Sequence, residues 1–200
     1  MAKGDDDDIP ELSEAEKIRA RALESDFAAM GAALRNGTAT PDDVKGAFAR
    51  LMSLPDVDPQ TWRNALHIPP DAGPYAGAID TILRRIPDGW GRWLSVDAGW
   101  YPLVIDTDAR LAHLDPDYVV HQIKEKFGTL RYYWATSSDD PSPELSDALY
   151  AVTDDAERIS AITCERCGEP GVLQDTRYWV KTLCASCADE LGYVYRPDGT

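Results

Sequence analysis

Hydrophobic residues in the first third of the chain recur every three or four positions, a spacing that predicts amphipathic helices. The first helix is predicted over 11–35, where Ser13 followed by Glu16 has the pattern of a capping box. Residues 1–10 are acidic and lack this periodicity, so they are predicted to form a disordered tail. The pattern therefore predicts a helical region over 11–70.

Two shorter helices are predicted in the same region. One begins at Pro41, because Thr40 is a favoured N-cap residue and proline is tolerated at the first helical position. Val44 belongs to the predicted buried face of this helix. The other is predicted over Pro59–Leu66, with Asp58 as its cap. Packing or partner binding is the simplest role for such a region.

A connection rich in proline and glycine at 67–75 marks the predicted boundary to a second region, 71–163. Helices are predicted here over Ala76–Arg85, over a segment ending at Leu114, and over Glu144–Ile159. A change to alternating polar and apolar positions between the last two helices predicts strands. Residues 71–163 are therefore expected to form an α+β core.

The alternating segment, 118–134, predicts a β-hairpin whose strands are separated by Phe127-Gly128. Phe-Gly departs from the Asn-Gly preferred in two-residue turns, so the register depends on the loop length. With a two-residue loop, one face carries the pairs His121–Trp134, Ile123–Tyr132 and Glu125–Leu130, and the other carries Gln122–Tyr133 and Lys124–Arg131.

The four cysteines of the chain form two C-x2-C pairs, Cys164 with Cys167 and Cys184 with Cys187. Sixteen residues separate the pairs, a spacing typical of a tetrahedral zinc site. Residues 164–200 are therefore predicted to be a zinc-binding module that holds one Zn²⁺. A strand running into the second pair and a helix after it favour a treble clef, and a zinc ribbon is the alternative. The whole chain is expected to have an α+β fold, with a mostly helical N-terminal part, a central hairpin or small antiparallel sheet, and this module.

Four thiolates would complete the coordination sphere, whereas a catalytic zinc keeps one position for water or substrate. The expected metal role is therefore structural. The sequence contains no HExxH, GxSxG, P-loop or GxGxxG motif, and His67, His113 and His121 are scattered. We expect no enzymatic activity and assign no catalytic residue.

The formal net charge of −15 disfavours binding to a phosphate backbone, because that affinity depends on clustered lysine and arginine. The zinc module carries Arg166, Arg177 and Lys181, and these would contact phosphates if it bound nucleic acid. No apolar run has the roughly 18 residues that span a bilayer, and the N-terminus lacks the apolar stretch of a secretory signal. A cytoplasmic location without membrane insertion is expected.

Basic residues cluster on the predicted hairpin in spite of the acidic composition. Lys124, Lys126 and Arg131 lie close together there, beside Tyr133. Like charges facing each other across strands are unfavourable unless something neutralises them. One interpretation is ion pairing with acids of neighbouring helices. The other is a surface that binds an anion or a partner.

The segments QIKEKFGTLRYYW, TCERCGEPG and WVKTLCASC together resemble a group of uncharacterised bacterial and phage proteins. In that group a KEKFG-LR-Y hairpin precedes a C-terminal four-cysteine zinc finger. The resemblance covers about residues 98–190 of this chain. It implies an intracellular zinc-binding protein and implies no particular reaction.

Taken together, these features favour a non-enzymatic, zinc-stabilised protein that binds another macromolecule, most simply a protein. Phage accessory, inhibitor and immunity-type roles suit its small size and acidity by analogy. A nucleic-acid-binding zinc finger is the first alternative. An enzyme with an unrecognised carboxylate or histidine site is the second.

Overall fold

The computed structural model describes residues 9–18, 30, 40–52, 58–176 and 179–194. The chain separates into two compact units, Asp8–Ala65 and Leu66–Thr200, which are described here one at a time. Most of the predicted acidic tail, and most of the helix predicted over 11–35, lie outside the described residues.

Helix starts in the Asp8–Ala65 unit carry the predicted capping residues. Residues 14–18 are helical, and the Ser13 N–H donates to Glu16 Oε2 at 2.7 Å while the Glu16 N–H donates to Ser13 Oγ at 3.3 Å. Helix α2 covers Pro41–Met52, and Thr40 makes the same reciprocal pair of hydrogen bonds, here with an aspartate. Both starts satisfy backbone donors that a helix leaves without internal partners.

Helix α3 covers Pro59–Asn64, and the Asp58 carboxylate accepts from the Thr61 N–H as the cap predicted. The helix ends two residues earlier than expected. The prediction that Val44 faces inward is wrong, because its exposed fraction is 45%. Periodicity alone cannot tell which face of a short amphipathic helix finds a packing partner.

A three-stranded sheet forms the centre of the Leu66–Thr200 unit. The predicted hairpin is confirmed as β2 (Val119–Lys126) and β3 (Thr129–Ala135), which pair in antiparallel fashion. The sheet is mixed because β1, only two residues long (Leu94–Ser95), pairs in parallel with β2. Sequence patterning cannot identify a strand of this length.

The hairpin turn has two residues, Phe127 and Gly128, and both adopt positive φ angles, 57° and 78°. This is the backbone that a type I′ turn requires. Four of the five predicted cross-strand pairs are confirmed: Gln122–Tyr133, Ile123–Tyr132, Lys124–Arg131 and Glu125–Leu130.

The predicted pairing of His121 with Trp134 is wrong, since Trp134 pairs with Val120. A bulge between Val120 and Gln122 leaves His121 without an opposite residue. Val120 and Ile123 are fully buried on one side of the strand, so the inserted residue places His121 and Gln122 together on the other, half-exposed side.

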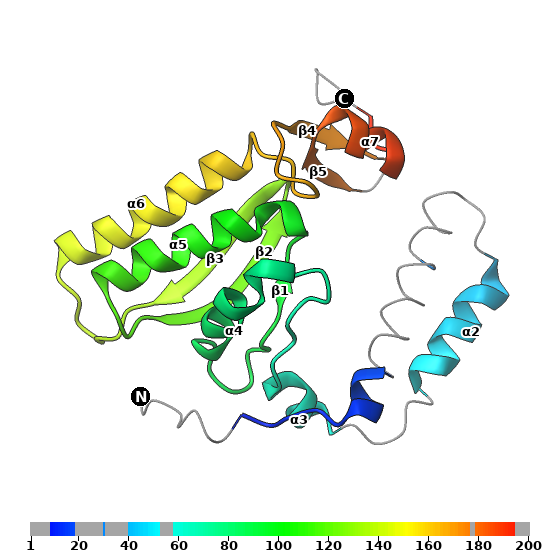
Figure 1. The fold of residues 1–200 in the computed structure, drawn as a ribbon, viewed down its shortest axis with the longest axis horizontal. Helices are drawn as coiled ribbons and strands as arrows, with labels where there is room; N and C mark the ends of the chain where they lie inside the picture. The colour runs from blue at the N-terminus through cyan, green and yellow to red at the C-terminus, as the bar shows by residue number, and fades with distance from the viewer. Residues whose placement is uncertain (1–8, 19–29, 31–39, 53–57, 177–178, 195–200) are drawn as a thin grey trace. The chain divides into compact units, whose positions relative to one another are not determined.

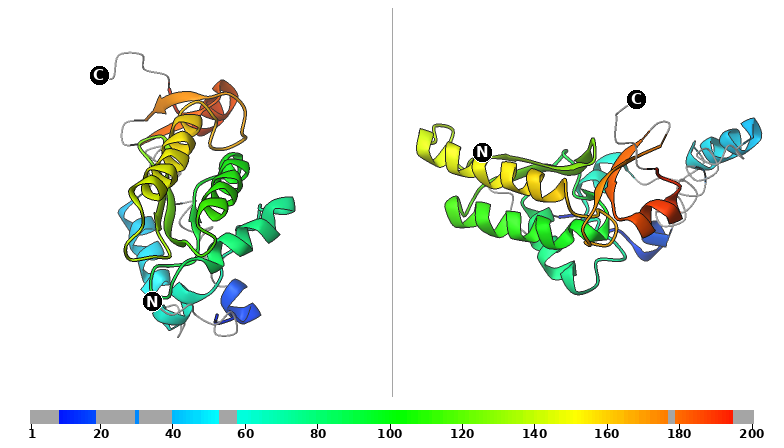
Figure 2. Two further views of the ribbon diagram at one scale, coloured as in Figure 1. Left: turned by 90° about the vertical axis from the view of Figure 1, so that its left-hand side faces the viewer. Right: turned by 90° about the horizontal axis from the view of Figure 1, so that it is seen from above.

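The helices of this unit cover one face of the sheet (Figures 1 and 2). Helix α5 packs against both α4 and α6, and α6 packs against β3. Among the described residues, no helix has the length and apolar character needed to cross a membrane. The helical elements are η2 (Gly73–Tyr75), α4 (Ala76–Arg84), η3 (Ala98–Trp100), α5 (Tyr101–Leu114) and α6 (Pro143–Ser160).

The core lies between these helices and the sheet. Residues Val120, Ile123 and Leu130 contribute the sheet side, and their exposed fractions are 1% or less. The helix side consists mainly of branched apolar residues, among them Ile79, Ile82, Leu83, Val104, Leu111, Leu149 and Val152. The ends of helices α4, α5 and α6 agree closely with the predicted ends. The apolar stripe from which each helix was predicted is also the face that packs in the core.

The C-terminal elements lie beside the tip of the β2–β3 hairpin (Figures 1 and 2). Strands β4 (Val172–Asp175) and β5 (Val180–Leu183) form a separate antiparallel pair. Helix α7 (Ala185–Leu191) follows β5 directly and ends at Gly192, whose φ of 71° suits a left-handed cap. We call residues 162–194 the cysteine module. The α+β fold with such a module is as predicted.

Candidate metal centre

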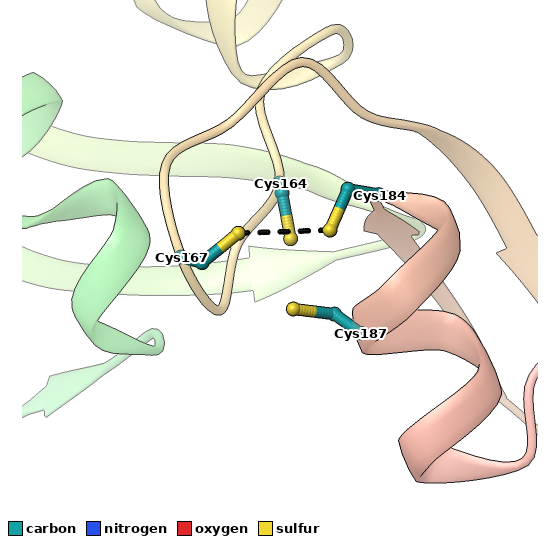
Figure 3. Close-up of side chains that lie close together, drawn as sticks. All are labelled: Cys164, Cys167, Cys184 and Cys187. Carbon is teal, nitrogen blue, oxygen red and sulfur yellow. Dashed lines mark hydrogen bonds between the residues drawn. The ribbon is translucent and has the colours of Figure 1, made fainter.

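The four cysteine side chains converge on one point (Figure 3). Their sulfur atoms all lie within 4.8 Å of one another, and Cys167 Sγ and Cys184 Sγ are 3.6 Å apart. The cysteines are free thiols rather than disulfides. For a zinc–sulfur bond of about 2.3 Å, tetrahedral geometry places the sulfurs about 3.8 Å apart. The arrangement therefore fits one tetrahedral metal ion.

Local backbone structure places each pair. The first pair lies on a tight turn, in which the Gly168 N–H donates to the Cys164 carbonyl oxygen at 2.9 Å and the Cys164 N–H donates to the Glu169 carbonyl oxygen at 2.7 Å. Gly168 has a φ of 82°, which is the left-handed region that glycine adopts without strain. In the second pair, Cys184 is the N-cap of α7 and Cys187 lies in its first turn.

The surroundings of the four thiols differ. Cys164 is fully buried and Cys167 is exposed. A hydrogen bond from the Ser186 hydroxyl, followed by one from the Cys187 N–H, lowers the pKa of Cys184 to about 6. Burial raises the pKa of Cys187. Because metal binding requires thiolates, binding would release protons, and Cys184 is the thiol most ready to ionise.

The donor set limits the chemistry of the site. Around a bound tetrahedral metal ion, the four protein sulfurs would fill every position and leave none for water or substrate. Sulfur ligands select soft or borderline metals such as zinc or iron and reject magnesium and calcium, which prefer oxygen. A closed sulfur site holds backbone segments together rather than activating a substrate.

A partly buried ion cluster joins the cysteine module to the helix-and-sheet core. Lys181 on β5 places its ammonium 2.8 Å from Glu165 Oε2 and 2.8 Å from Asp97 Oδ2. Glu165 lies between the first two cysteines and is only 1% exposed. Burial raises the pKa of Glu165 to about 7, against the opposing effect of the ammonium. Burial alone would lower the pKa of Lys181, but the two carboxylates raise it.

The turn that carries the first cysteine pair rests on Gly99. A Cβ atom there would lie 2.4 Å from both the Cys164 carbonyl oxygen and the Gly168 nitrogen, which is too close for any side chain. The adjacent Trp100 is fully buried, and its indole N–H donates to the Thr163 carbonyl oxygen at 2.8 Å. The core thus contacts the backbone of the metal ligands directly.

The cysteine module also holds the hairpin tip. The Thr182 hydroxyl donates to the Gly128 carbonyl oxygen at 2.6 Å. A Cβ atom at Gly128 would lie 2.3 Å from the Leu173 Cδ1, so strand β4 closes over the turn. Gly128 of the hairpin turn is therefore packed against the two strands that precede the second cysteine pair.

The three basic residues predicted on the hairpin have different surroundings. Arg131 forms an ion pair with Glu157 of α6, so the ion-pairing interpretation describes this residue. The ammonium of Lys124 lies 5.3 Å from the centre of the Tyr133 ring, and that of Lys126 lies 5.3 Å from the centre of the Phe127 ring. These are cation–π distances, and no carboxylate pairs with either lysine among the described residues.

Two further polar groupings were not foreseen from the sequence. In the core, the Tyr118 hydroxyl donates to Asp108 Oδ1 at 2.5 Å and lies 2.8 Å from the Tyr132 hydroxyl, while Arg85 pairs with the same aspartate. Burial raises the pKa of both tyrosines, so they stay neutral and the grouping acts as internal hydrogen bonding.

The second grouping is on the surface. Trp90, which is 54% exposed, stacks on His121 with ring centres 4.3 Å apart and planes 8° from parallel. Burial lowers the pKa of His121. The two residues are 31 positions apart, so no local pattern could connect them.

Comparison with known proteins found no match: no family model, no curated protein and no solved structure is similar to this chain. The function has to be argued from the residues described above.

Proposed function

We propose that the four cysteines bind one structural Zn²⁺ and that the protein is a non-enzymatic module that binds a protein partner. The observation that carries this proposal is the packing of the hairpin turn on the cysteine module through Thr182 and Gly128. Through this contact the metal would support the hairpin that presents Lys124 and Lys126. The metal has a structural role in this proposal, and the hairpin supplies the binding surface.

Zinc is the proposed metal because four thiolates in a tetrahedron are its usual structural site. It brings no redox chemistry and has no geometric preference of its own, so it suits a site whose shape the backbone determines. A turn bearing two ligands, a strand pair, and a helix bearing the other two correspond to the treble-clef arrangement, which we infer here in preference to a zinc ribbon.

Two features support a binding role rather than catalysis. The proposed zinc has no open position, and both tyrosines of the tyrosine–aspartate–arginine grouping are buried in the core. His121, the histidine with a lowered pKa, has its ring stacked on the ring of Trp90. A binding protein requires neither an activated water nor a general base.

The contacts of the module's basic residues favour a protein partner over nucleic acid. Arg166 pairs with Glu190, and Lys181 lies between two carboxylates, so a phosphate would compete with a carboxylate at each residue. Arg177 lies outside the described residues. The net charge of −15 adds repulsion from any polyanion.

Free cysteines that bind zinc are typical of reducing compartments, and a cytoplasmic location is part of the proposal. The resemblance of the hairpin and cysteine motifs to those of bacterial and phage proteins is consistent with it. Accessory, inhibitor and immunity-type roles all act by binding a protein, and the proposal covers these without choosing among them.

The test is purification of the tagged full chain under native conditions, with metal analysis and mass spectrometry on the same sample. We expect one zinc per chain and one protein in stoichiometric amount. A Cys184→Ala variant serves as the control and should lose both. A chain that carries zinc and purifies alone would contradict the binding role, and a chain that never carries zinc would contradict the metal assignment.

A further inference from the structure

We propose that the outer face of the β2–β3 hairpin binds an extended acidic peptide of the partner, with carboxylates at alternate positions. This hairpin face is defined by Lys124, Lys126, Phe127 and Tyr133. The proposal rests on the protein-binding function proposed above and adds the surface and the chemistry of the partner. Four observations support the proposal: the two lysines have no carboxylate partner in the part of the chain that the structure describes, the backbone of Phe127 is strained, the lysines have the spacing of an extended peptide, and aromatic rings position their ammonium groups.

The two lysines are exceptional in their charge environment. In the described part of Leu66–Thr200, every other lysine or arginine lies in an ion pair with a carboxylate. The chain carries 35 acidic and only 20 basic residues, so acids are abundant partners. Lys124 and Lys126 have no carboxylate partner among the described residues and lie two positions apart on one strand. Together they form a local cationic surface that is complementary to an anion.

Phe127 is the second observation. It is the one non-glycine residue of the described chain with a positive φ, 57°, and it is also 71% exposed. A large aromatic residue is disfavoured in this conformation, whereas asparagine adopts it readily. Because the Phe127 ring is exposed in the free protein, its burial does not offset the cost of this backbone conformation. Strain of this kind is typical of residues that make a functional contact.

The spacing of the lysines determines the shape of the ligand. Residues 124 and 126 alternate with buried Ile123 and therefore project from the same face, about 7 Å apart along the strand. Side chains at alternate positions of an extended peptide have the same repeat. Two carboxylates separated by one residue can therefore meet the two ammonium groups without bending the peptide.

The aromatic rings prepare the surface for such a ligand. Tyr133 and Phe127 are 41% and 71% exposed, and each has a lysine ammonium 5.3 Å from its ring centre. The rings restrict the positions of the flexible lysine chains without neutralising their charge. They also offer apolar area to the residues between the carboxylates.

A single-stranded nucleic acid also carries anions and stacks on aromatic rings. Its affinity, however, grows with the number of cations that displace counterions, and this face provides only two free ones on a chain of net charge −15. Two contacts suffice for a peptide. The observations therefore favour the peptide, and an oligonucleotide becomes a comparison in the test.

The test measures fluorescence anisotropy of a labelled decapeptide of alternating glutamate and threonine with the zinc-loaded full chain. Matched probes are the same peptide with glutamine in place of glutamate, and a single-stranded oligothymidylate. We expect the affinity of the glutamate peptide to fall as the salt concentration is raised. At the same salt concentration, the glutamine peptide should bind about tenfold more weakly than the glutamate peptide. Equal binding of both peptides, or binding of the oligothymidylate alone, would overturn the proposal.

Variants locate the site. The double variant Lys124→Gln, Lys126→Gln should lose about tenfold in affinity. The pair Lys17→Gln, Lys45→Gln removes the same charge elsewhere and should leave affinity unchanged. Phe127→Asn should weaken peptide binding while raising the unfolding temperature, a combination that damage to the fold cannot produce. Unchanged affinity in the double variant refutes the hairpin face.

Failure here and failure of the proposed function are distinguishable. If the stoichiometric partner still co-purifies with the Lys124→Gln, Lys126→Gln variant, the protein-binding function stands and the hairpin face is the wrong surface. If no partner co-purifies with the zinc-loaded wild-type chain, the binding function itself fails.

Discussion

The Thr182 hydroxyl donates a hydrogen bond of 2.6 Å to the carbonyl oxygen of Gly128. Thr182 lies two residues before Cys184, and Gly128 lies in the turn of the hairpin, so the bond joins two parts of the chain 54 residues apart. Both residues are buried. The cysteine module and the hairpin tip thus form one structural unit, although β5 and the β2–β3 hairpin belong to different sheets.

The first prediction follows from this bond. Thr182→Val keeps the shape of the side chain but leaves the buried Gly128 carbonyl oxygen without this donor, which should cost about 1–3 kcal/mol in the free energy of unfolding. Metal content should stay at the wild-type level. Chemical denaturation measures the loss of stability, hydrogen exchange at 127–130 locates it, and metal analysis measures the metal content. Thr153→Val, which removes a hydroxyl that bonds only within α6, is the control and should cost much less.

Loss of a metal ligand should have a larger effect than loss of that hydrogen bond. Cys184→Ala removes one of four sulfur ligands, and the binding free energy of a structural zinc is part of the folding free energy. We expect the variant to lose its zinc and the cysteine module to unfold, as would wild-type protein treated with a chelator. Ser186→Ala, which changes a hydrogen bond to Cys184 but no ligand, should keep the metal. A Cys184→Ala variant with full stability and zinc content would refute the structural role.

Lys181→Met tests the ion cluster. The substitution leaves Glu165, 1% exposed, without its cation and with a pKa raised further, so Glu165 should take up a proton, and the lost hydrogen bonds should destabilise the protein by about 1–3 kcal/mol. Adding Glu165→Gln should restore part of that loss, because glutamine is neutral without taking up a proton. Lys45→Met, at an exposed pair, should be nearly neutral. Thermal unfolding of the wild type, both single variants, the double variant and the Lys45→Met control checks the prediction, which additive losses from Lys181→Met and Glu165→Gln would contradict.

The stacking of Trp90 on His121 predicts a pKa for this histidine below its ordinary value of 6.5, because burial disfavours the charged ring. In the unfolded chain the histidine takes up its proton near pH 6.5, and the folded protein takes it up only at lower pH. The unfolded state therefore binds more protons in that interval, and this contribution to stability falls as pH drops through 6.5. Trp90→Ala should return the pKa toward 6.5, as NMR titration of the ring would show. An unchanged pKa in the variant would mean that Trp90 is not the desolvating group.

Features governed by neighbours in the chain were predicted well. The capping box at Ser13 and the N-caps at Thr40 and Asp58 form as expected, because each bond spans only three residues. Helix α4 ends one residue from its predicted end for a related reason, since its apolar stripe is a local property. The convergence of the four cysteines was also predictable, because C-x2-C spacing brings two sulfurs together within a single turn.

Features that depend on distant residues were missed or wrong. Strand β1 consists of two residues that pair with β2, which is distant in the sequence. The bulge at His121 changes one of the predicted cross-strand pairs. The ion cluster joins Asp97, Glu165 and Lys181 from three separate segments. The position of Glu165 between two cysteines in the sequence did not indicate that its side chain would be buried. Burial depends on the segments that pack over the side chain.

By itself, the amino-acid sequence determined the helices with their caps, the hairpin, and a sulfur site able to hold a metal, since each is encoded in residue types at short, regular spacing. Only the tertiary structure decided that the cysteine module packs on the hairpin turn and that Arg131 finds an acid while Lys124 and Lys126 do not. The reason is physical: hydrogen bonds and ion pairs depend on atoms a few ångströms apart, and chain segments distant in sequence reach such separations only through the packing of the whole unit.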